Sequence, residues 1–439
     1  MIPVVTPAEM AAIDAAAPEP VDELIDRAGR AVARSAIAMM GGTYGRRVAV
    51  VAGPGNNGAD GRVAATVLRR RGVRAVVLDP GVATVPGGFD LVIDAAYGTG
   101  LSRSYDGPTV AEGTPVLAVD IPSGVDGATG RLVGTPVAAD RTVTFAALKP
   151  GLVLEPGRSL AGDIEVVDLG LDVGGATIDV VEGRDVADWL PVRSAEAHKW
   201  HSAVRVVGGS ARMTGAPRLA ARSAQRMGAG YVELAIPGRS GSEDPIEAVG
   251  HPLPATGWGA VAAADTRRLG ALLVGPGLGP DCEADIAVVL QTDRPLVVDG
   301  DALQPDFIAT LAARSAPTVL TPHGGEFARL VGASAADPIA ATRSLAAATD
   351  SVVVHKGPTT IVAAPDGPTL LVANGDPALA TAGTGDVLAG AIAAILAQGT
   401  DPLRAAAAAA WVHAEAGRGR VGLIASDLPS HMAGVLGSG

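Results

Sequence analysis

Short runs of β-branched and other apolar residues alternate along the chain with longer Ala-, Leu- and Arg-containing segments of helical period. This alternation is typical of parallel α/β sheets, in which a helix follows each buried strand. In the first half, the pattern predicts strands at 47–52, 75–78, 91–93, 116–119, 141–144 and 164–167. It also predicts helices at 6–16, 21–40 and 60–71. The first half therefore reads as one α/β unit.

A second series of the same kind begins at residue 204. It predicts strands at 204–207, 231–235, 271–274, 296–298, 318–320, 352–355 and 360–363, and helices at about 216–227, 386–398 and 402–416. Between the two series, residues 168–200 mix Gly-Gly, acidic residues and a proline without sustained periodicity, which indicates a connector. We therefore predict two α/β domains, at 1–180 and 181–439.

Length and charge narrow the functional classes. A chain of 439 residues exceeds a single comfortable core, and 48% hydrophobic with 18% charged residues indicates a globular protein. A net charge of −12, with no basic tract longer than Arg69 to Arg71, argues against a nucleic-acid partner. The single Cys282, the lack of a signal peptide and the lack of an apolar run long enough to cross a bilayer predict a cytoplasmic protein without a membrane partner.

The segment Gly383-Thr-Gly-Asp386, followed at once by an apolar run, is the most informative motif. A glycine-rich turn that opens a helix presents free N–H groups and the positive end of the helix dipole, which together hold phosphate oxygens. We expect Asp386 at the first helical position, where it can deprotonate a hydroxyl that faces the phosphate. Taken alone, the motif is equally compatible with a simple helix cap.

Polar residues also follow three predicted strands in the first half. The turn GPGNNGADG (53–61) lacks the G-x-G-x-x-G spacing of hydride-transfer enzymes, and IDAAYGTGL (93–101) and DIPSGVD (120–126) follow later strands. Parallel strands place these turns at one sheet edge, so we expect Asn57, Asp94 and Ser123 to cluster there, with oxygen ligands that suit a hard cation. Asp120 ends an apolar strand, where partial burial favours acid–base function.

These three motifs and TFAALKPGL (144–152), in this order, resemble the NAD(P)H-hydrate epimerase domain. The resemblance implies a Rossmann-like three-layer domain that epimerises the hydrated nicotinamide carbon of NADHX and NADPHX beside a bound potassium ion. By this resemblance, Asn57, Asp94 and Ser123 are the potassium ligands. The implied substrate contacts are Asn56, Asn57, Gly58, Ala59, Asp60, Gly98, Thr99, Gly100, Leu101, Ser102, Arg103, Ser104 and Asp120.

Two residues in these motifs need separate comment. Lys149 lies in the matching Lys-Pro-Gly turn, but the sequence leaves open whether it has a role or is a surface lysine. Ala59 replaces the usual glycine of the family. We expect its methyl group to be tolerated only if the residue keeps a negative φ.

The second half carries its own ordered motifs. They are HKWHSA (198–203), VVGGSARMTGA (206–216), VGPGLG (274–279), VDGDAL (298–303), LTPHGGEF (320–327) and HKGPTT (355–360), followed by the Gly383–Asp386 segment. This order resembles the ribokinase-like superfamily and, within it, the ADP/ATP-dependent NAD(P)H-hydrate dehydratase. The resemblance implies a ribokinase-like α/β domain in which a nucleotide phosphorylates the misplaced hydroxyl. Loss of phosphate then restores the dihydronicotinamide.

The same resemblance implies a set of site residues. Facing the hydrate would be Ala216, one of Gly277 or Gly279, His323 and Asp386, with Asp386 as the catalytic base. Facing the nucleotide, ADP or ATP with Mg²⁺, would be Lys356, Gly357, Pro358, Thr359, Thr360, Gly383, Thr384 and Gly385, the last three as an anion hole. Departures from the family pattern stand at Trp200, Gln304, Gly324 and Ala382.

The leading hypothesis is therefore a bifunctional nicotinamide-nucleotide repair enzyme, which we expect to form a homo-oligomer. A ribokinase-like kinase of a small alcohol, fused to a ligand-binding Rossmann-like domain, is the alternative, because the Gly383–Asp386 segment serves both chemistries. A third reading makes the first domain a ligand-sensing module, since a fold alone guarantees no catalysis. The choice between ADP and ATP stays open.

Overall fold

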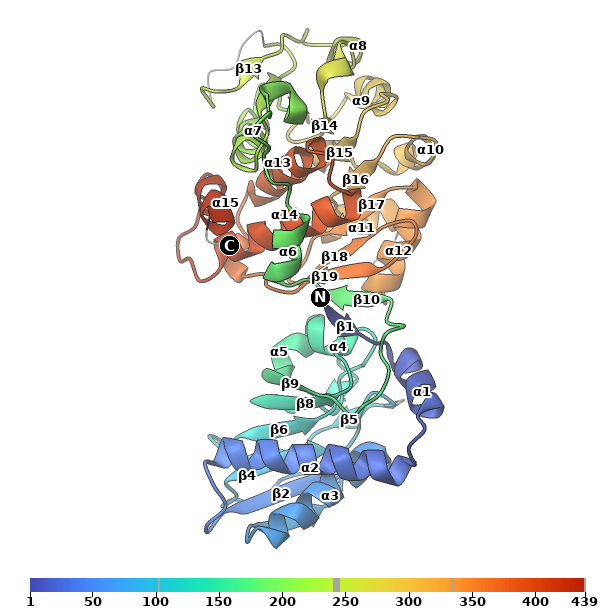
Figure 1. The fold of residues 1–439 in the computed structure, drawn as a ribbon, viewed down its shortest axis with the longest axis vertical. Helices are drawn as coiled ribbons and strands as arrows, with labels where there is room; N and C mark the ends of the chain where they lie inside the picture. The colour runs from blue at the N-terminus through green and yellow to red at the C-terminus, as the bar shows by residue number, and fades with distance from the viewer. Residues whose placement is uncertain (102, 240–244, 333–334, 438–439) are drawn as a thin grey trace. The chain divides into compact units, whose positions relative to one another are not determined.

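The computed structural model describes residues 1–101, 103–239, 245–332 and 335–437. The chain divides into two compact units, one of Ile2–Ile178 and one of Met1 together with Asp179–Gly439 (Figure 1). We call them the N-terminal unit and the C-terminal unit and describe each by itself. Strand β10 (Ile178–Val180) lies at the division.

The N-terminal unit is built on a parallel sheet with the strand order β3-β2-β4-β6-β8-β9. The strands of the whole unit, three of which lie outside this sheet, are β1 (Ile2–Val4), β2 (Arg47–Ala52), β3 (Arg74–Leu78), β4 (Leu91–Ala95), β5 (Tyr105–Asp106), β6 (Val116–Val119), β7 (Gly134–Thr135), β8 (Arg141–Phe145) and β9 (Asp163–Val167). Its helices are α1 (Pro7–Ala16), α2 (Val21–Met40), α3 (Asn56–Arg70), α4 (Pro150–Val153) and α5 (Gly157–Ala161).

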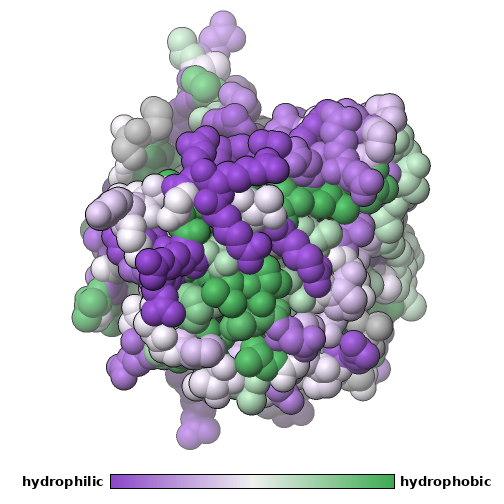
Figure 2. Space-filling view, turned by 90° about the horizontal axis from the view of Figure 1, so that it is seen from below, coloured by the Kyte–Doolittle hydropathy of each residue, from purple (hydrophilic) through white to green (hydrophobic). Residues whose placement is uncertain are grey.

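Helices α2 and α3 lie side by side against one face of this sheet, where alternate strand residues such as Val48 and Val50 join their core (Figure 1). The intervening residues Ala49 and Val51 pack in a second core on the other face. This alternation is the period of two that a strand imposes on its side chains. The unit also keeps apolar surface outside its core. Val76 of β3, for example, is 44% exposed. Separately, Figure 2 shows a hydrophobic area among hydrophilic residues on the face in view.

The C-terminal unit contains a sheet whose strands run in the order β19-β18-β17-β16-β15-β14-β11-β12-β13. They are β11 (Ala203–Val207), β12 (Tyr231–Ala235), β13 (Val249–Gly250), β14 (Ala271–Val274), β15 (Leu296–Val298), β16 (Thr318–Leu320), β17 (Val352–His355), β18 (Thr360–Ala363) and β19 (Thr369–Val372). All neighbours from β13 to β17 pair in parallel, whereas β18 is antiparallel to both β17 and β19.

Helices cover both faces of this sheet, so the unit has three layers. They are α6 (Gly183–Trp189), α7 (Gly215–Arg226), α8 (Gly259–Ala262), α9 (Glu283–Leu290), α10 (Ile308–Ala312), α11 (Gly324–Val331), α12 (Pro338–Thr349), α13 (Thr384–Ala397), α14 (Pro402–Gly417) and α15 (Leu428–Gly437). Helices α7, α13, α14 and α15 share one core with the sheet, and α9, α11 and α12 share the other.

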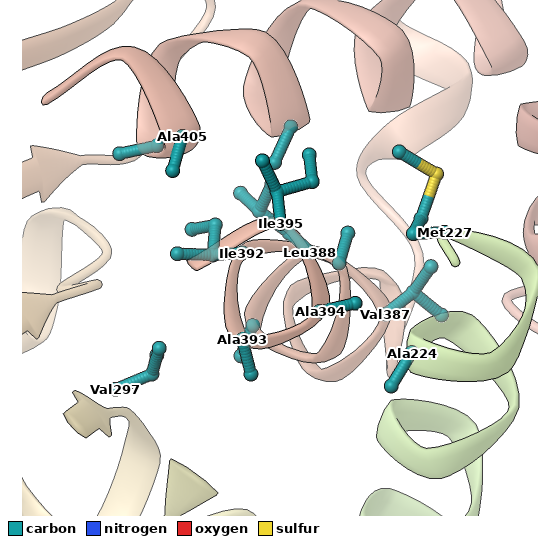
Figure 3. Packing of buried hydrophobic residues seen from close by; sticks show 14 of the residues in the cluster. Ala224, Met227, Val297, Val387, Leu388, Ile392, Ala393, Ala394, Ile395 and Ala405 are labelled. Atoms are coloured by element: carbon teal, nitrogen blue, oxygen red, sulfur yellow. The ribbon is translucent and has the colours of Figure 1, made fainter. Parts of the chain in front are cut away.

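Helix α13 lies in the middle of the first of these cores. Figure 3 shows Ile392 and Ala393 within a cluster that also contains Val297 from β15 and Ala224 from α7. A side chain at Gly390 would place its Cβ 2.1 Å from the carbonyl oxygen of Ala220, so only glycine allows α7 and α13 this close. The helix that carries the Gly383–Asp386 segment is therefore rigidly held.

Every strand that the apolar runs predict is present, which confirms the α/β class, but the predicted strand at 360–363 pairs antiparallel, so only the sheet of the N-terminal unit is parallel throughout. Three further details of the prediction were wrong. Helix α3 begins at Asn56, not at 60, because the tight turn at Gly55 leads directly into it. The expected connector contains α6 and the whole of β10, and the apolar strand β19 was missed. No helix in the described part of the chain is long and apolar enough to span a membrane.

Candidate functional site

The N-terminal unit contains a cavity of about 490 Å³ at the carboxyl ends of β2, β4 and β6. Its apolar wall includes Leu24, Phe145 and Leu171. Of the residues predicted to contact substrate, it is lined by Asn56, Asn57, Asp60, Gly98, Thr99, Gly100, Leu101 and Asp120. Parallel sheets bind ligands at this edge, and a mostly apolar cavity with a few convergent polar groups is the usual form of a small-molecule site.

Asp120 forms an ion pair with Lys149 in this cavity. The Lys149 Nζ lies 2.9 Å from Asp120 Oδ1, and the lysine side chain is only 1% exposed. Lys149 also donates to the hydroxyl of Thr144 and the carbonyl of Phe145. Asp120 has φ of 67°, a left-handed conformation that a non-glycine residue adopts only under structural constraint. Lys149 is therefore a site residue, a role that the sequence left open.

Asp60 and Asp14 bring two further carboxyl groups to the same cavity. Burial raises the pKa of Asp60 to about 8, and the nearby carboxyls of Asp120 and Asp14 add to the rise. Burial also raises the pKa of Asp14, which lies at the exposed rim. Sequence reasoning missed Asp14, since the helix at 6–16 carried no motif.

Asp94 and Ser123, two of the predicted potassium ligands, are in direct contact with each other but do not line the cavity. The Ser123 hydroxyl donates to Asp94 Oδ1 at 2.6 Å, and its backbone N–H donates to Oδ2 at 2.8 Å. Complete burial raises the pKa of Asp94, and these hydrogen bonds oppose the rise. Both side-chain polar atoms of Asn57 are buried without a hydrogen-bond partner among the described residues.

Close backbone packing explains the glycines of this loop. A Cβ at Gly58 would lie 1.8 Å from the carbonyl oxygen of Gly53, and one at Gly98 would lie 3.0 Å from Asp120 Oδ2. Ala59 lies inside α3 and is not among the residues with positive φ, so its methyl group causes no strain. The remaining predicted contacts do not line the cavity. Gly58, Ala59 and Ser104 lie outside its wall, Arg103 donates to the hydroxyl of Tyr97, and Ser102 lies outside the described residues.

In the C-terminal unit, the Gly383–Asp386 segment forms the start of α13. Gly383 caps the helix with φ of 93°, so Asp386 is the third helical residue. Our expectation that it is the first helical residue was wrong. His413 of α14 supports this turn, because its Nε2 lies 2.9 Å from the carbonyl oxygen of Thr384. A carbonyl only accepts, so Nε2 carries the hydrogen. Burial lowers the pKa of His413 to about 4 and keeps the ring neutral.

Lys356 directly follows β17 and contacts Asp299 at the end of β15 and Glu326 in α11. Its Nζ lies 3.0 Å from Asp299 Oδ1 and 4.0 Å from Glu326 Oε2, and a Cβ built on Gly385 would lie 3.2 Å from it. Burial lowers the pKa of Lys356, but the two carboxylates outweigh this effect, and its pKa is raised. Asp299 and Glu326 were absent from the predicted site. The motifs that contain them, VDGDAL (298–303) and LTPHGGEF (320–327), were recognised in the sequence, each at the end of a strand.

Asp386 faces the same charged cluster. Burial raises its pKa to about 7, Asp299 adds to the rise, and Lys356 opposes it. A carboxyl whose pKa is near neutrality can take a proton at physiological pH and release it again. The described residues include no group of three or more His, Cys, Asp or Glu side chains arranged to hold a metal ion.

The other predicted contacts of the hydrate lie at a helix start and on loops that follow strands. A Cβ at Gly277 would lie 3.1 Å from that of Ala216, so the structure brings these two together. The N–H of Gly279 instead donates to Asp301 Oδ2. His323 caps α11 by accepting from Gly325 and Glu326, and its side chain is 60% exposed.

In the predicted nucleotide segment, the two threonines differ in their surroundings. Thr359 is buried, and the hydroxyl of Thr360 donates to the carbonyl oxygen of Gly357. The carbonyl oxygen of Pro358 would lie 2.4 Å from a Cβ on Gly375. The segment that follows β17 is therefore packed closely against the chain that leads to α13.

The four departures from the family pattern fit their local structure. Gly324 occupies the first helical position of α11, where proline is also favoured, and Ala382 is exposed without positive φ. The ring of Trp200 lies 4.4 Å from that of Tyr231, and the amide of Gln304 donates to the carbonyl of Asp301.

Comparison with known protein families matches both units. The NAD(P)H-hydrate dehydratase family matches residues 204–422, and the family described as YjeF-related protein N-terminus matches residues 21–87 and 79–151. Among solved structures, a ribokinase-like superfamily protein from Enterococcus faecalis aligns with a TM-score of 0.53 and 23% identity over 60% of this chain and 96% of its own. This likeness shows the fold of the C-terminal unit.

A second solved structure is closer in sequence. It is the ADP/ATP-dependent NAD(P)H-hydrate dehydratase from Bacillus subtilis, co-crystallised with ATP/Mg²⁺. It is 30% identical, aligns with a TM-score of 0.50, and covers 58% of this chain and 95% of its own.

Curated relatives match nearly the whole chain. The bifunctional NAD(P)H-hydrate repair enzyme Nnr of Mycobacterium tuberculosis H37Rv is 39% identical over 86% of this chain and 84% of its own length. The enzyme of the same name from Moorella thermoacetica is 35% identical over 97% and 94%. With both units matched in one continuous chain, the protein belongs to the family of bifunctional NAD(P)H-hydrate repair enzymes.

Proposed function

We propose that residues 1–180 are an NAD(P)H-hydrate epimerase domain and residues 181–439 an ADP- or ATP-dependent NAD(P)H-hydrate dehydratase domain. Together they return both epimers of hydrated NADH and NADPH to the reduced cofactors. The observation that carries the proposal is the pairing at the start of α13, where a carboxyl with a pKa near neutrality faces the Lys356 ammonium. This combination serves deprotonation of a hydroxyl beside a phosphate.

In the dehydratase site, Asp386 removes the proton of the misplaced hydroxyl, and the oxygen attacks the terminal phosphorus of the nucleotide. The bond from this phosphorus to its bridging oxygen breaks, and ADP leaves from ATP, or AMP from ADP, with the electrons of that bond. The Lys356 ammonium and the N–H groups of Gly383 and Gly385 hold the phosphate oxygens, whereas the N–H of Thr384 donates to the carbonyl of Thr381 within the turn. These donors are already fixed by Asp299, Glu326 and the helix start, so they need no reorganisation as charge develops. Phosphate then leaves the ring carbon with the C–O electrons, a neighbouring carbon loses a proton, and the ring double bond returns.

The nucleotide enters as its magnesium complex, as a substrate. The Bacillus subtilis relative was co-crystallised with ATP/Mg²⁺, which supports Mg²⁺ use. The positive end of α13 and Lys356 suit the phosphates of ADP and of ATP equally. Ala216 in the first turn of α7, Gly277 after β14 and the α11 cap His323 remain our proposed contacts of the hydrate.

A potassium ion fits the N-terminal site. Asp94 is a buried carboxylate without a basic partner among the described residues, and Asn57 has a buried carbonyl oxygen without a partner. Together with the Ser123 oxygen, these are the hard oxygen donors that such a cation requires. Asn57, Asp94 and Ser123 would hold the ion, whose charge would offset that of the buried carboxylate.

The decisive assay supplies each purified epimer with ADP or ATP and Mg²⁺ and follows the absorbance of reduced nicotinamide. We expect the S hydrate to recover directly and the R hydrate to recover through epimerisation. A stable phosphorylated product without phosphate release would instead identify an alcohol kinase.

The same assay in K⁺ and in Na⁺, with the melting temperature as a second readout, tests the potassium site. An equal melting temperature in both salts would reject it.

We also propose that the protein is a cytoplasmic homo-oligomer. The exposed apolar area in Figure 2 supports self-association, since such areas often mark interfaces. Light scattering on the purified chain measures its oligomeric state, and a monomer at all concentrations would reject self-association.

A further inference from the structure

The epimerase cavity contains two carboxyl groups in opposite surroundings. Asp120 is ion-paired with Lys149 and accepts from Thr144. Asp60 is only 7% exposed, yet its carboxyl forms no hydrogen bond or ion pair with any described residue. Both side chains line the same 490 Å³ cavity, Asp60 from α3 and Asp120 from the end of β6. An ion-paired carboxylate accepts a proton, whereas a buried carboxyl without a cation is stable in its neutral, proton-donating form.

We propose that Asp60 is the proton donor and Asp120 the proton acceptor of the epimerase, which inverts the hydrated ring carbon by loss and re-addition of water. This inference rests on the proposed epimerase function and identifies the residue that serves as its general acid. Burial raises the pKa of Asp60 to about 8, in agreement with a neutral carboxyl at physiological pH. The other charged groups that line the cavity are Asp14, at its exposed rim, and Lys149.

The proposed step balances without a further reactant. Asp60 protonates the ring hydroxyl, water leaves with the C–O electrons, and the lone pair of the ring nitrogen forms a C=N bond. Water adds to the opposite face of the carbon while Asp120 takes its proton, and the C=N electrons return to nitrogen. One proton has then moved from Asp60 to Asp120. Exchange with solvent through the open rim returns it.

The test uses the full chain without nucleotide and measures interconversion of the purified epimers by chromatography. We expect Asp60→Asn to lower kcat by at least about 100-fold while KM changes little, because the neutral amide keeps the shape of the acid but donates weakly. Asp60→Glu should regain part of the rate. The wild-type rate should fall as pH rises through about 8, and the residual rate of Asp60→Asn should lack this fall.

Heavy-oxygen water provides a second readout. Loss and re-addition of water predict that solvent oxygen enters the hydrate as fast as the epimers interconvert. Glu112→Gln, an exposed carboxyl change in the same unit, is the matched control and should leave kcat unchanged. An Asp60→Asn variant that keeps its kcat, or raises only KM, overturns the donor role. Epimerisation without oxygen exchange overturns the water-loss step. A wild-type chain that does not interconvert the epimers refutes the epimerase function itself.

Discussion

Asp386 shows how one buried residue links catalysis to stability. Its carboxyl is surrounded by Asp299 and Glu326, and a single ammonium, that of Lys356, opposes them. A raised pKa means that the folded protein holds this proton more tightly than the unfolded chain does. The stability that the proton confers is therefore complete at low pH and is lost as pH rises toward 7.

Replacing Asp386 with Asn should abolish dehydration of the S hydrate and stabilise the free protein at alkaline pH. The gain in unfolding free energy should grow as pH rises from about 4 to about 7 and then level off, on the order of a few kcal/mol. Wild-type dehydration should fall as pH drops through about 7, because the base must be ionised. Melting curves and initial rates across pH measure both effects. Equal melting temperatures of the two proteins at pH 8 would contradict this account.

At the scale of elements, the start of α13 is held by its neighbour α14. His413 is 7% exposed, and its neutral ring donates to the Thr384 carbonyl within the turn that should bind phosphate. The hydroxyl of Thr384 in turn donates to the carbonyls of Leu379 and Thr381. The His413 side chain of α14 and the Thr384 side chain, which is bonded to backbone carbonyls of the loop before α13, thus fix the direction of the N–H groups in this turn.

His413→Phe should lower kcat of dehydration by about 10-fold and destabilise the fold by about 1–3 kcal/mol, because a buried carbonyl loses its donor. Since the ring is neutral above about pH 4, the effect should not vary between pH 5 and 8. His413→Gln, which retains an N–H donor, should recover part of the rate. His201→Gln changes an exposed histidine and is the control. An unaltered kcat in His413→Phe would show that α14 does not position the turn.

At the scale of the whole molecule, each proposed activity is confined to one compact unit. Every residue of the epimerase cavity lies within Ile2–Ile178, and every residue of the charged cluster at α13 lies beyond Asp179. A change in one site should therefore leave the chemistry of the other intact.

Asp120→Asn should stop recovery from the R hydrate but not from the S hydrate, whereas Asp386→Asn should stop both. Mixing the two variants should restore recovery from the R hydrate, because the S epimer diffuses from one chain to another. Rates with each epimer and with the mixture measure this directly. A mixture that fails to recover would show that the hydrate passes between the two sites of a single chain. Unchanged epimerisation in Asp120→Asn would reject its catalytic role.

The candidate sites were predictable where a motif directly follows a strand. The Gly53–Gly61 turn, Asp94, Asp120 and the start of α13 all lie at predicted strand ends or helix starts. Partners distant in sequence were not predictable. Lys149 reaches Asp120 only because of the turn after β8, and Asp299 meets Lys356 across 57 residues.

The sequence by itself determined the α/β class, most of the strands, the division into two α/β units and the family motifs. These depend on local periodicity and on residues close together in the chain, which the amino-acid pattern records directly. Only the tertiary structure decided which carboxyl groups are buried, which are ion-paired, and how His413 and Lys356 approach the start of α13. Burial and charge contacts arise when distant segments pack, so Asp120 has an ion-pair partner and the buried Asp60 has none among the described residues because of the fold around them.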